Sequence, residues 1–114
     1  MGMRKAMTKR SNRGKDAYVR QILEALRREY LPLHPQAKID AYRYNPASIR
    51  VRIIDPCFEG RPITQRDDEV RQLLRRNLPE DVRADINLLL LLAPGETKKS
   101  PANLEFEDPI PAEL

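Results

Sequence analysis

The sequence is poor in cysteine, with Cys57 as the only one in 114 residues. A single thiol forms no disulfide within the chain and does not build a multi-cysteine zinc site, which favours a reducing, cytoplasmic location. Long apolar runs are also missing. The longest, residues 86–93 interrupted by Asn87, is far shorter than the roughly 20 residues that cross a bilayer. No apolar segment of a signal peptide follows the basic start, so we expect neither secretion nor membrane insertion.

What the sequence does contain is typical of one soluble globular domain with a charged segment at each end. Residues 1–15 hold six basic residues and no acid, residues 16–94 hold 13 basic and 12 acidic residues, and residues 95–114 hold two lysines and five acids. We therefore predict a basic flexible arm over 1–15, an α+β domain over 16–96 and an acidic, proline-containing flexible tail over 97–114.

The first half of the domain predicts a helix and a β-hairpin. Apolar residues between 19 and 30 recur with the spacing of one helical face, Asp16 can cap this helix, and Pro32 ends it. Segments 38–44 and 48–54 show two-residue alternation around a turn at 45–47. In the second segment, Ile49, Val51 and Ile53 are expected to face the core.

The second half predicts a helix over about 64–77, a short helical turn after Pro79 and a last strand over 86–92. Thr64 is the expected N-cap of the longer helix, with acids at 67–69 in its first turn. The nearly unbroken apolar run at 86–92 is typical of a strand covered on both faces, and it should lie parallel to the strand before the helix. The predicted order is α-β-β-α-(short α)-β, a three-stranded mixed sheet with helices packed on one face.

The run from Phe58 to Arg66, FEGRPITQR, precedes a helix that contains Val70, and the last strand ends in Ala-Pro-Gly-Glu at 93–96. In these features the chain resembles the BolA family. The resemblance implies a fold similar to class II KH domains and partnership with monothiol glutaredoxins. It also implies shared binding of an iron–sulfur cluster in some members and proposed contact with DNA or RNA in others.

The chain departs from the family pattern at the positions that hold the cluster. The family's Arg-His pair is Arg66-Asp67 here, its cluster-binding histidine falls on or near Asp85, and its loop ligand falls in 45–47, Asn-Pro-Ala. Iron prefers thiolate and imidazole ligands over an amide and a carboxylate. We therefore predict no cofactor and no metal. The residues assigned to the family motif are Phe58, Gly60, Arg66, Asp67 and Asp85.

Catalytic residue types are present, but their placement does not predict a catalytic site. Cys57 at the end of a strand is interpreted as a structural, buried cysteine, and His34 in a proline-flanked connector as a surface residue that could be only a remote base. Asp67 and Asp68 are interpreted as partners of a helix dipole. Since no nucleophile, base and orienting group come together, we predict that the protein is not an enzyme.

Arginines form the remaining pattern, with Tyr42 and Tyr44 close to them in the hairpin. Such residues can grip phosphates and stack on bases, although a dispersed, solvated charge surface is the other interpretation. The preferred hypothesis is an adaptor or regulatory protein that binds another protein, with a monothiol glutaredoxin as candidate partner; the alternative is a nucleic-acid-binding domain. Whether the chain is a monomer or a homodimer stays open. The arginines in question are Arg43, Arg50, Arg52, Arg61, Arg66 and Arg71.

Overall fold

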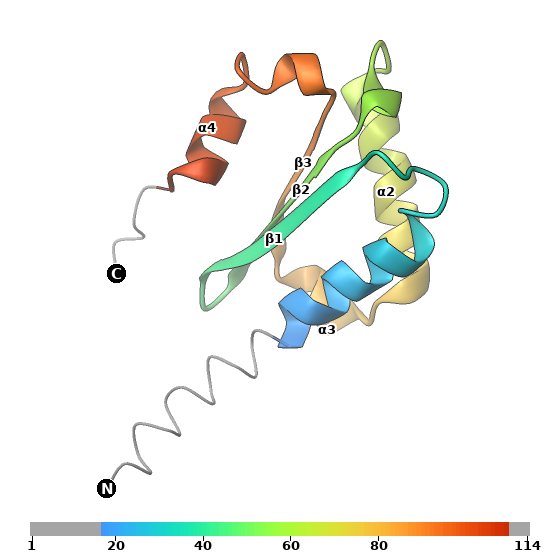
Figure 1. Cartoon of the computed structure of the whole chain (residues 1–114). Helices are drawn as coiled ribbons and strands as arrows, with labels where there is room; N and C mark the ends of the chain where they lie inside the picture. The colour runs from blue at the N-terminus through green and yellow to red at the C-terminus, as the bar shows by residue number, and fades with distance from the viewer. Residues whose placement is uncertain (1–16, 110–114) are drawn as a thin grey trace, which may run out of the picture.

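The computed structural model describes residues 17–109 and shows an α+β fold with the predicted order of elements. A first helix, described over 17–29, leads into the sheet and its crossover helices (Figure 1). No helix in this part of the chain is long and apolar enough to span a bilayer. The following elements are β1 (Lys38–Asn45), β2 (Ser48–Ile54), η1 (Pro56–Phe58), α2 (Ile63–Asn77), α3 (Glu80–Ala84), β3 (Ile86–Leu92), η2 (Pro94–Glu96) and α4 (Pro101–Glu107).

The sheet has the order β1-β2-β3, with β1 antiparallel and β3 parallel to β2. This confirms the mixed sheet that the sequence predicts. The hairpin turn is closed by the backbone N–H of Ala47, which donates to the Oδ1 of Asn45 at 2.9 Å. Lys38 pairs with Ile54 at the other end of the hairpin, so the start of β1 and the end of β2 lie side by side.

The main core lies between the sheet and the first helix with α2 (Figure 1). As predicted, Ile49, Val51 and Ile53 all point into this core and are fully buried. They share one face of the sheet because every second side chain of a strand points to the same side. Their partners on the helices include Leu26 and Val70. This packing confirms the prediction that helices cover this face of the sheet.

The opposite face of the sheet is covered by α4, and here the sequence-based prediction is wrong. We expected 97–114 to be a flexible tail, but Pro101–Glu107 forms a helix whose Phe106 packs on Leu90 and Leu92. Ser100 caps this helix by accepting from the backbone N–H of Asn103. The folded unit thus extends beyond residue 96. Residues 110–114 and the predicted basic arm over 1–15 lie outside the described residues.

The start of α2 also differs from the prediction. The helix begins at Ile63, directly after Pro62, and Thr64 lies inside it instead of capping it. Pro62 is the N-cap: its ψ of 145° lies outside the helical range, and its carbonyl accepts the first helical bond from the backbone N–H of Arg66. Asp67 then falls beyond the first turn, where it binds Arg71 one turn further on at 2.8 Å.

Candidate functional site

The loop between β2 and α2 carries the residues that resemble the BolA motif, and several of them shape the backbone. Phe58 is fully buried and fixes η1 on the core. Gly60 has a φ of +75°, a backbone conformation that residues with a Cβ atom rarely adopt. Asp55 caps η1, because its Oδ1 accepts from the backbone N–H of Cys57 at 3.0 Å. The motif therefore builds a fixed turn at the end of β2.

Arg66, another motif residue, is buried and joins three parts of the fold. Its guanidinium donates to the carbonyl oxygens of Arg61 and Leu91 and to both carboxylate oxygens of Glu96, at 2.7 and 2.9 Å. This bidentate contact, with the backbone N–H of Ala93, lowers the pKa of Glu96 to about 2. Arg66 thus holds the start of α2 against the end of β3.

The positions that the BolA resemblance assigns to cluster ligands, at or near Asp85 and in the hairpin turn, do not fit an iron–sulfur cluster. Asp85 is the ion-pair partner of Arg43 at 3.1 Å. In the hairpin turn, the side-chain oxygen of Asn45 accepts from the backbone. Both positions offer oxygen donors, whereas such clusters are held by thiolate or imidazole.

The six arginines singled out in the sequence are not brought together on one surface. Arg50 and Arg52 lie on the α4 face, whereas Arg43 lies near Tyr18 of the first helix. Each of the six also forms an ion pair, so its positive charge is partly offset by a neighbouring carboxylate. The pairs are Arg43–Asp85, Arg50–Glu105, Arg52–Asp40 and Glu107, Arg61–Glu69, Arg66–Glu96, and Arg71–Asp67.

Arg52 shows what these pairs do on the α4 face. Its side chain is about nine-tenths buried, and it donates to Asn103, Glu107 and Asp40, each at 2.8 Å. The guanidinium also lies over the ring of Phe106, 4.5 Å from its centroid. Arg52 therefore ties α4 to both strands of the hairpin.

A cluster that the sequence did not predict lies at the end of β2, where His34, Asp55 and Cys57 meet. Nδ1 of His34 is 3.0 Å from Oδ2 of Asp55, and the ligand-type atoms of all three residues lie within 4.8 Å of one another. Tyr30 supports the group: its hydroxyl donates to Oδ2 of Asp55 at 2.5 Å, and its ring stacks on His34 with centroids 4.2 Å apart.

Two predictions about this cluster are wrong. Cys57 is exposed instead of buried, and His34 is next to it instead of remote. The reason is the hairpin: the connector that carries His34 leads into Lys38, and Lys38 pairs with Ile54, which directly precedes Asp55. The Asp55 carboxylate and partial desolvation raise the pKa of the Cys57 thiol, with Arg61 acting in the opposite direction.

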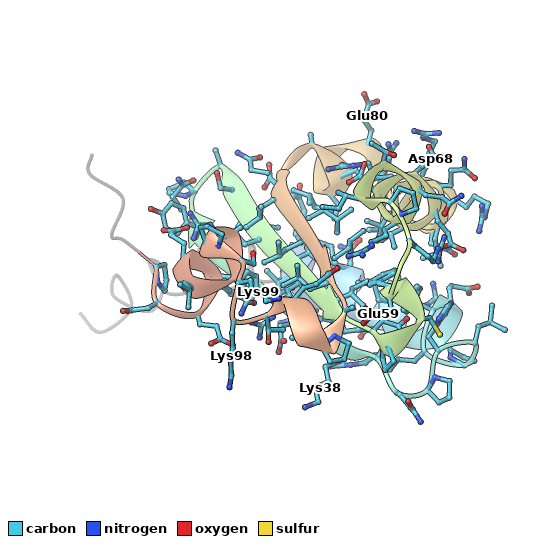
Figure 2. The ribbon with its side chains drawn as sticks, turned by 90° about the horizontal axis from the view of Figure 1, so that it is seen from above. Lys38, Glu59, Asp68, Glu80, Lys98 and Lys99 are labelled. Carbon is cyan, nitrogen blue, oxygen red and sulfur yellow. The ribbon has the colours of Figure 1, made fainter. Side chains whose placement is uncertain are left out.

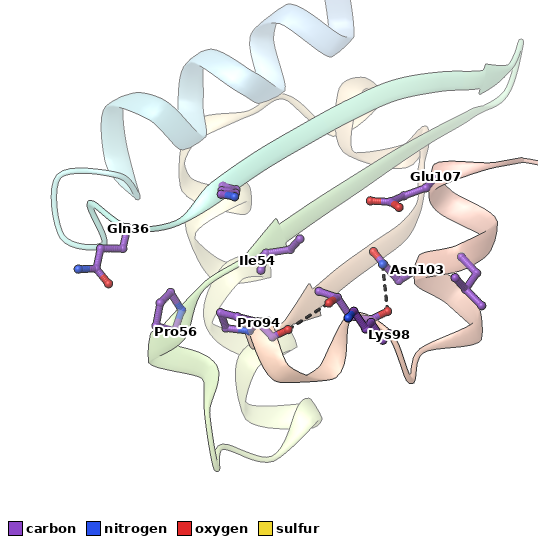
Figure 3. Close-up of a pocket in the computed structure, with 10 residues that line it drawn as sticks. Gln36, Ile54, Pro56, Pro94, Lys98, Asn103 and Glu107 are labelled. Atoms are coloured by element: carbon purple, nitrogen blue, oxygen red, sulfur yellow. Dashed lines mark hydrogen bonds between the residues drawn. The ribbon is translucent and has the colours of Figure 1, made fainter.

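A pocket of about 430 Å³ lies between α4 and the end of β2 (Figure 3). Its walls include the apolar residues Ile54, Pro56, Pro94 and Leu104. Two hydrogen bonds brace the segment that joins η2 to α4: Thr97 donates to the carbonyl of Pro94, and Asn103 donates to the carbonyl of Thr97. The remaining lining residues are Gln36, Lys38, Thr97, Lys98, Asn103 and Glu107.

Comparison with known proteins gave one similarity. No protein-family model matches the chain, and no curated protein matches it. Among solved structures, the chain is similar to BolA1 from Arabidopsis thaliana, with 23% sequence identity, a TM-score of 0.44, and coverage of 74% of this chain and 96% of that chain. The predicted order of elements and the mixed sheet are seen in the structure itself.

Proposed function

We propose that this chain is a non-enzymatic adaptor that binds another protein through the pocket beside α4. The observation that carries the proposal is the combination of an apolar wall with an exposed leucine. Leu104 is 59% exposed although it is a large apolar side chain, and it lines the same pocket as Ile54 and Pro94. Exposed apolar surface in a pocket is typical of a site that buries a partner's side chain.

The charged side chains at the rim of the pocket indicate which kind of protein segment it could bind. Lys38 and Lys98 line the pocket, and Figure 2 shows both side chains pointing outward on the same side of the molecule. Glu107 lines the pocket too, but it is bound to Arg52. The pocket thus fits a protein segment with one apolar side chain flanked by carboxylates. The BolA resemblance makes a monothiol glutaredoxin the first partner to test.

The test is a calorimetric titration of the full chain with a monothiol glutaredoxin, in its apo and cluster-loaded forms. We expect binding that Leu104→Glu weakens by about tenfold or more, as for an interface hot spot. Leu33→Glu is the matched control, because Leu33 is also exposed, at 77%, and does not line the pocket. No binding in either form, or loss of binding in the Leu33 variant alone, would refute the proposal.

Nucleic-acid binding is the competing outcome of the same experiments. It predicts an affinity for single-stranded DNA or RNA that falls steeply with salt and drops when residues 1–15 are removed. Arg50 and Arg52 are poor positions for this test because they hold α4 through Glu105 and Glu107. Salt-dependent binding to nucleic acid, together with no binding to a protein partner, would replace the adaptor proposal.

A further inference from the structure

The cluster at the end of β2 joins the chain's single histidine and single cysteine with a buried carboxylate. Asp55 is 1% exposed, and its backbone N–H donates to the carbonyl of Leu92, which fixes it to the sheet. His34 is fixed by its backbone bond to Tyr30 and by ring stacking. Two of the three side chains are therefore held in place before any ligand arrives, whereas the third, Cys57, is exposed and contacts the Asp55 carboxylate.

The contact between His34 and Asp55 is close without being a hydrogen bond. Nδ1 lies 3.0 Å from Oδ2, yet this buried nitrogen has no hydrogen-bond partner within the described residues, because its in-plane direction is not aligned with that oxygen. A buried polar atom without a partner is costly. A nitrogen and an oxygen that lie this close without pointing at each other are placed to share a third atom.

We propose that His34, Asp55 and Cys57 bind a Zn²⁺ ion whose fourth coordination position is open to solvent. Zinc takes sulfur, nitrogen and oxygen ligands at about 2.0–2.3 Å, so its tetrahedral ligands lie about 3–4 Å apart. The 3.0 Å between Nδ1 and Oδ2 is already close to this spacing. A rotation of the exposed Cys57 side chain would bring the sulfur in from its place within 4.8 Å of a ring nitrogen of His34 and a carboxylate oxygen of Asp55.

Charge balance also favours a divalent ion at this position. The carboxylate of Asp55 and the thiolate of Cys57 together offset the two positive charges of zinc, and the thiol proton leaves to solvent when the metal binds. Tyr30 then acts as the outer partner that orients the carboxylate, through its 2.5 Å bond to Oδ2. Three protein ligands with one open position are typical of zinc sites that bind a further ligand.

Nucleophilic catalysis by Cys57 is the alternative use of the same residues, and the geometry disfavours it. An activated thiol needs surroundings that stabilise its anion. Here the fixed carboxylate of Asp55 is its close neighbour, which acts against a free thiolate. A metal ion removes this conflict, because it is attracted by both groups at once.

The proposal is tested on the tag-free full chain, stripped with a chelator and titrated with Zn²⁺ and with Co²⁺ as a spectroscopic probe. We expect one ion per chain, a sulfur-to-cobalt charge-transfer band, and a higher melting temperature with zinc. Because loss of even an outer partner costs about 10–100-fold in metal affinity, Cys57→Ser and His34→Gln should each weaken zinc binding at least that much.

The controls separate ligand loss from misfolding and from surface binding. Cys57→Ser changes an exposed side chain, so its fold should persist by circular dichroism even if the His34 variant unfolds. Asp68→Asn, on an exposed acid of α2, should leave zinc affinity unchanged. Cobalt binding without a thiolate band, or equal zinc affinity in Cys57→Ser and the parent chain, would overturn the site. Neither outcome depends on a protein partner, so the adaptor proposal is judged separately.

Discussion

At the scale of single residues, the buried polar groups of this chain are connectors between elements. Arg66 joins α2, β3 and η2 through four hydrogen bonds. Tyr30 joins the first helix to the end of β2 through Asp55. The sequence could place these residues on their elements but could not show their partners, because Glu96 and Asp55 are 30 and 25 residues away along the chain.

The Arg66–Glu96 pair predicts how stability depends on pH. The pKa of Glu96 is lowered from its ordinary value of 4.5 to about 2 in the fold. The pair therefore contributes fully above pH 4.5, and its contribution is lost as the pH falls from 4.5 towards 2. Since 39% of the Glu96 side chain is exposed, solvent screens the pair, and Glu96→Gln should cost only about 1 kcal/mol at pH 7.

Urea denaturation at several pH values checks this prediction. The parent chain should lose more stability than Glu96→Gln does as the pH falls through this range. Glu24→Gln, on the exposed face of the first helix, should follow the parent chain. Parallel curves for the parent chain and Glu96→Gln would show that the pair contributes nothing to acid sensitivity.

The Tyr30 hydroxyl gives a second prediction at this scale. Tyr30→Phe keeps the stacking on His34 but removes a donor from the fully buried carboxylate of Asp55. A buried acceptor that loses its partner costs about 1–3 kcal/mol. Tyr18→Phe removes the same kind of bond at an exposed position, to Asp81, and should stay within about 0.5 kcal/mol of the parent chain. Equal unfolding free energies for the two variants would contradict the role given to Tyr30.

At the scale of elements, hydrophobic periodicity predicted the described helices and strands up to residue 92 and missed α4. The prolines and acids of the C-terminal segment are typical of a flexible tail, and they hide a two-turn helix with a single buried aromatic, Phe106. A signal was nevertheless present in β3. Its nearly unbroken apolar run indicated cover on both faces, while the predicted helices covered only one, so a further element had to pack on the sheet.

The packing of α4 predicts unequal effects from its two large apolar residues. Phe106 is 5% exposed and contacts Leu90 and Leu92, whereas Leu104 is 59% exposed. Phe106→Ala should cost about 3 kcal/mol, at the low end of the range for buried phenylalanine, because α4 can shift into the space. Leu104→Ala should stay within about 0.5 kcal/mol. Chemical denaturation of both variants checks this, and a smaller loss for Phe106→Ala than for Leu104→Ala would rule it out.

At the scale of the whole molecule, the cluster of His34, Asp55 and Cys57 is a product of topology. An antiparallel hairpin places the start of its first strand beside the end of its second, and here these ends are Lys38 and Ile54. The connector before β1 and the loop after β2 must therefore meet, which the predicted hairpin already implied. The distances between side chains could not be predicted, because they depend on how each loop turns back over the core.

The packing of the whole molecule also indicates that the folded unit needs its C-terminal segment. Removing residues 98–114 takes away α4, uncovers Leu90 and Leu92, and leaves Arg50 and Arg52 without Glu105 and Glu107. Uncovered apolar surface on a sheet is a template for self-association.

The chain that ends at residue 97 should therefore melt at a lower temperature, bind more of the dye ANS, and sediment as larger species as its concentration rises. Restoring residues 98–109 alone should reverse all three effects, since they contain all of α4. A truncated chain that stays monomeric with an unchanged melting temperature would mean that the sheet and its first layer of helices suffice, as the sequence alone predicted.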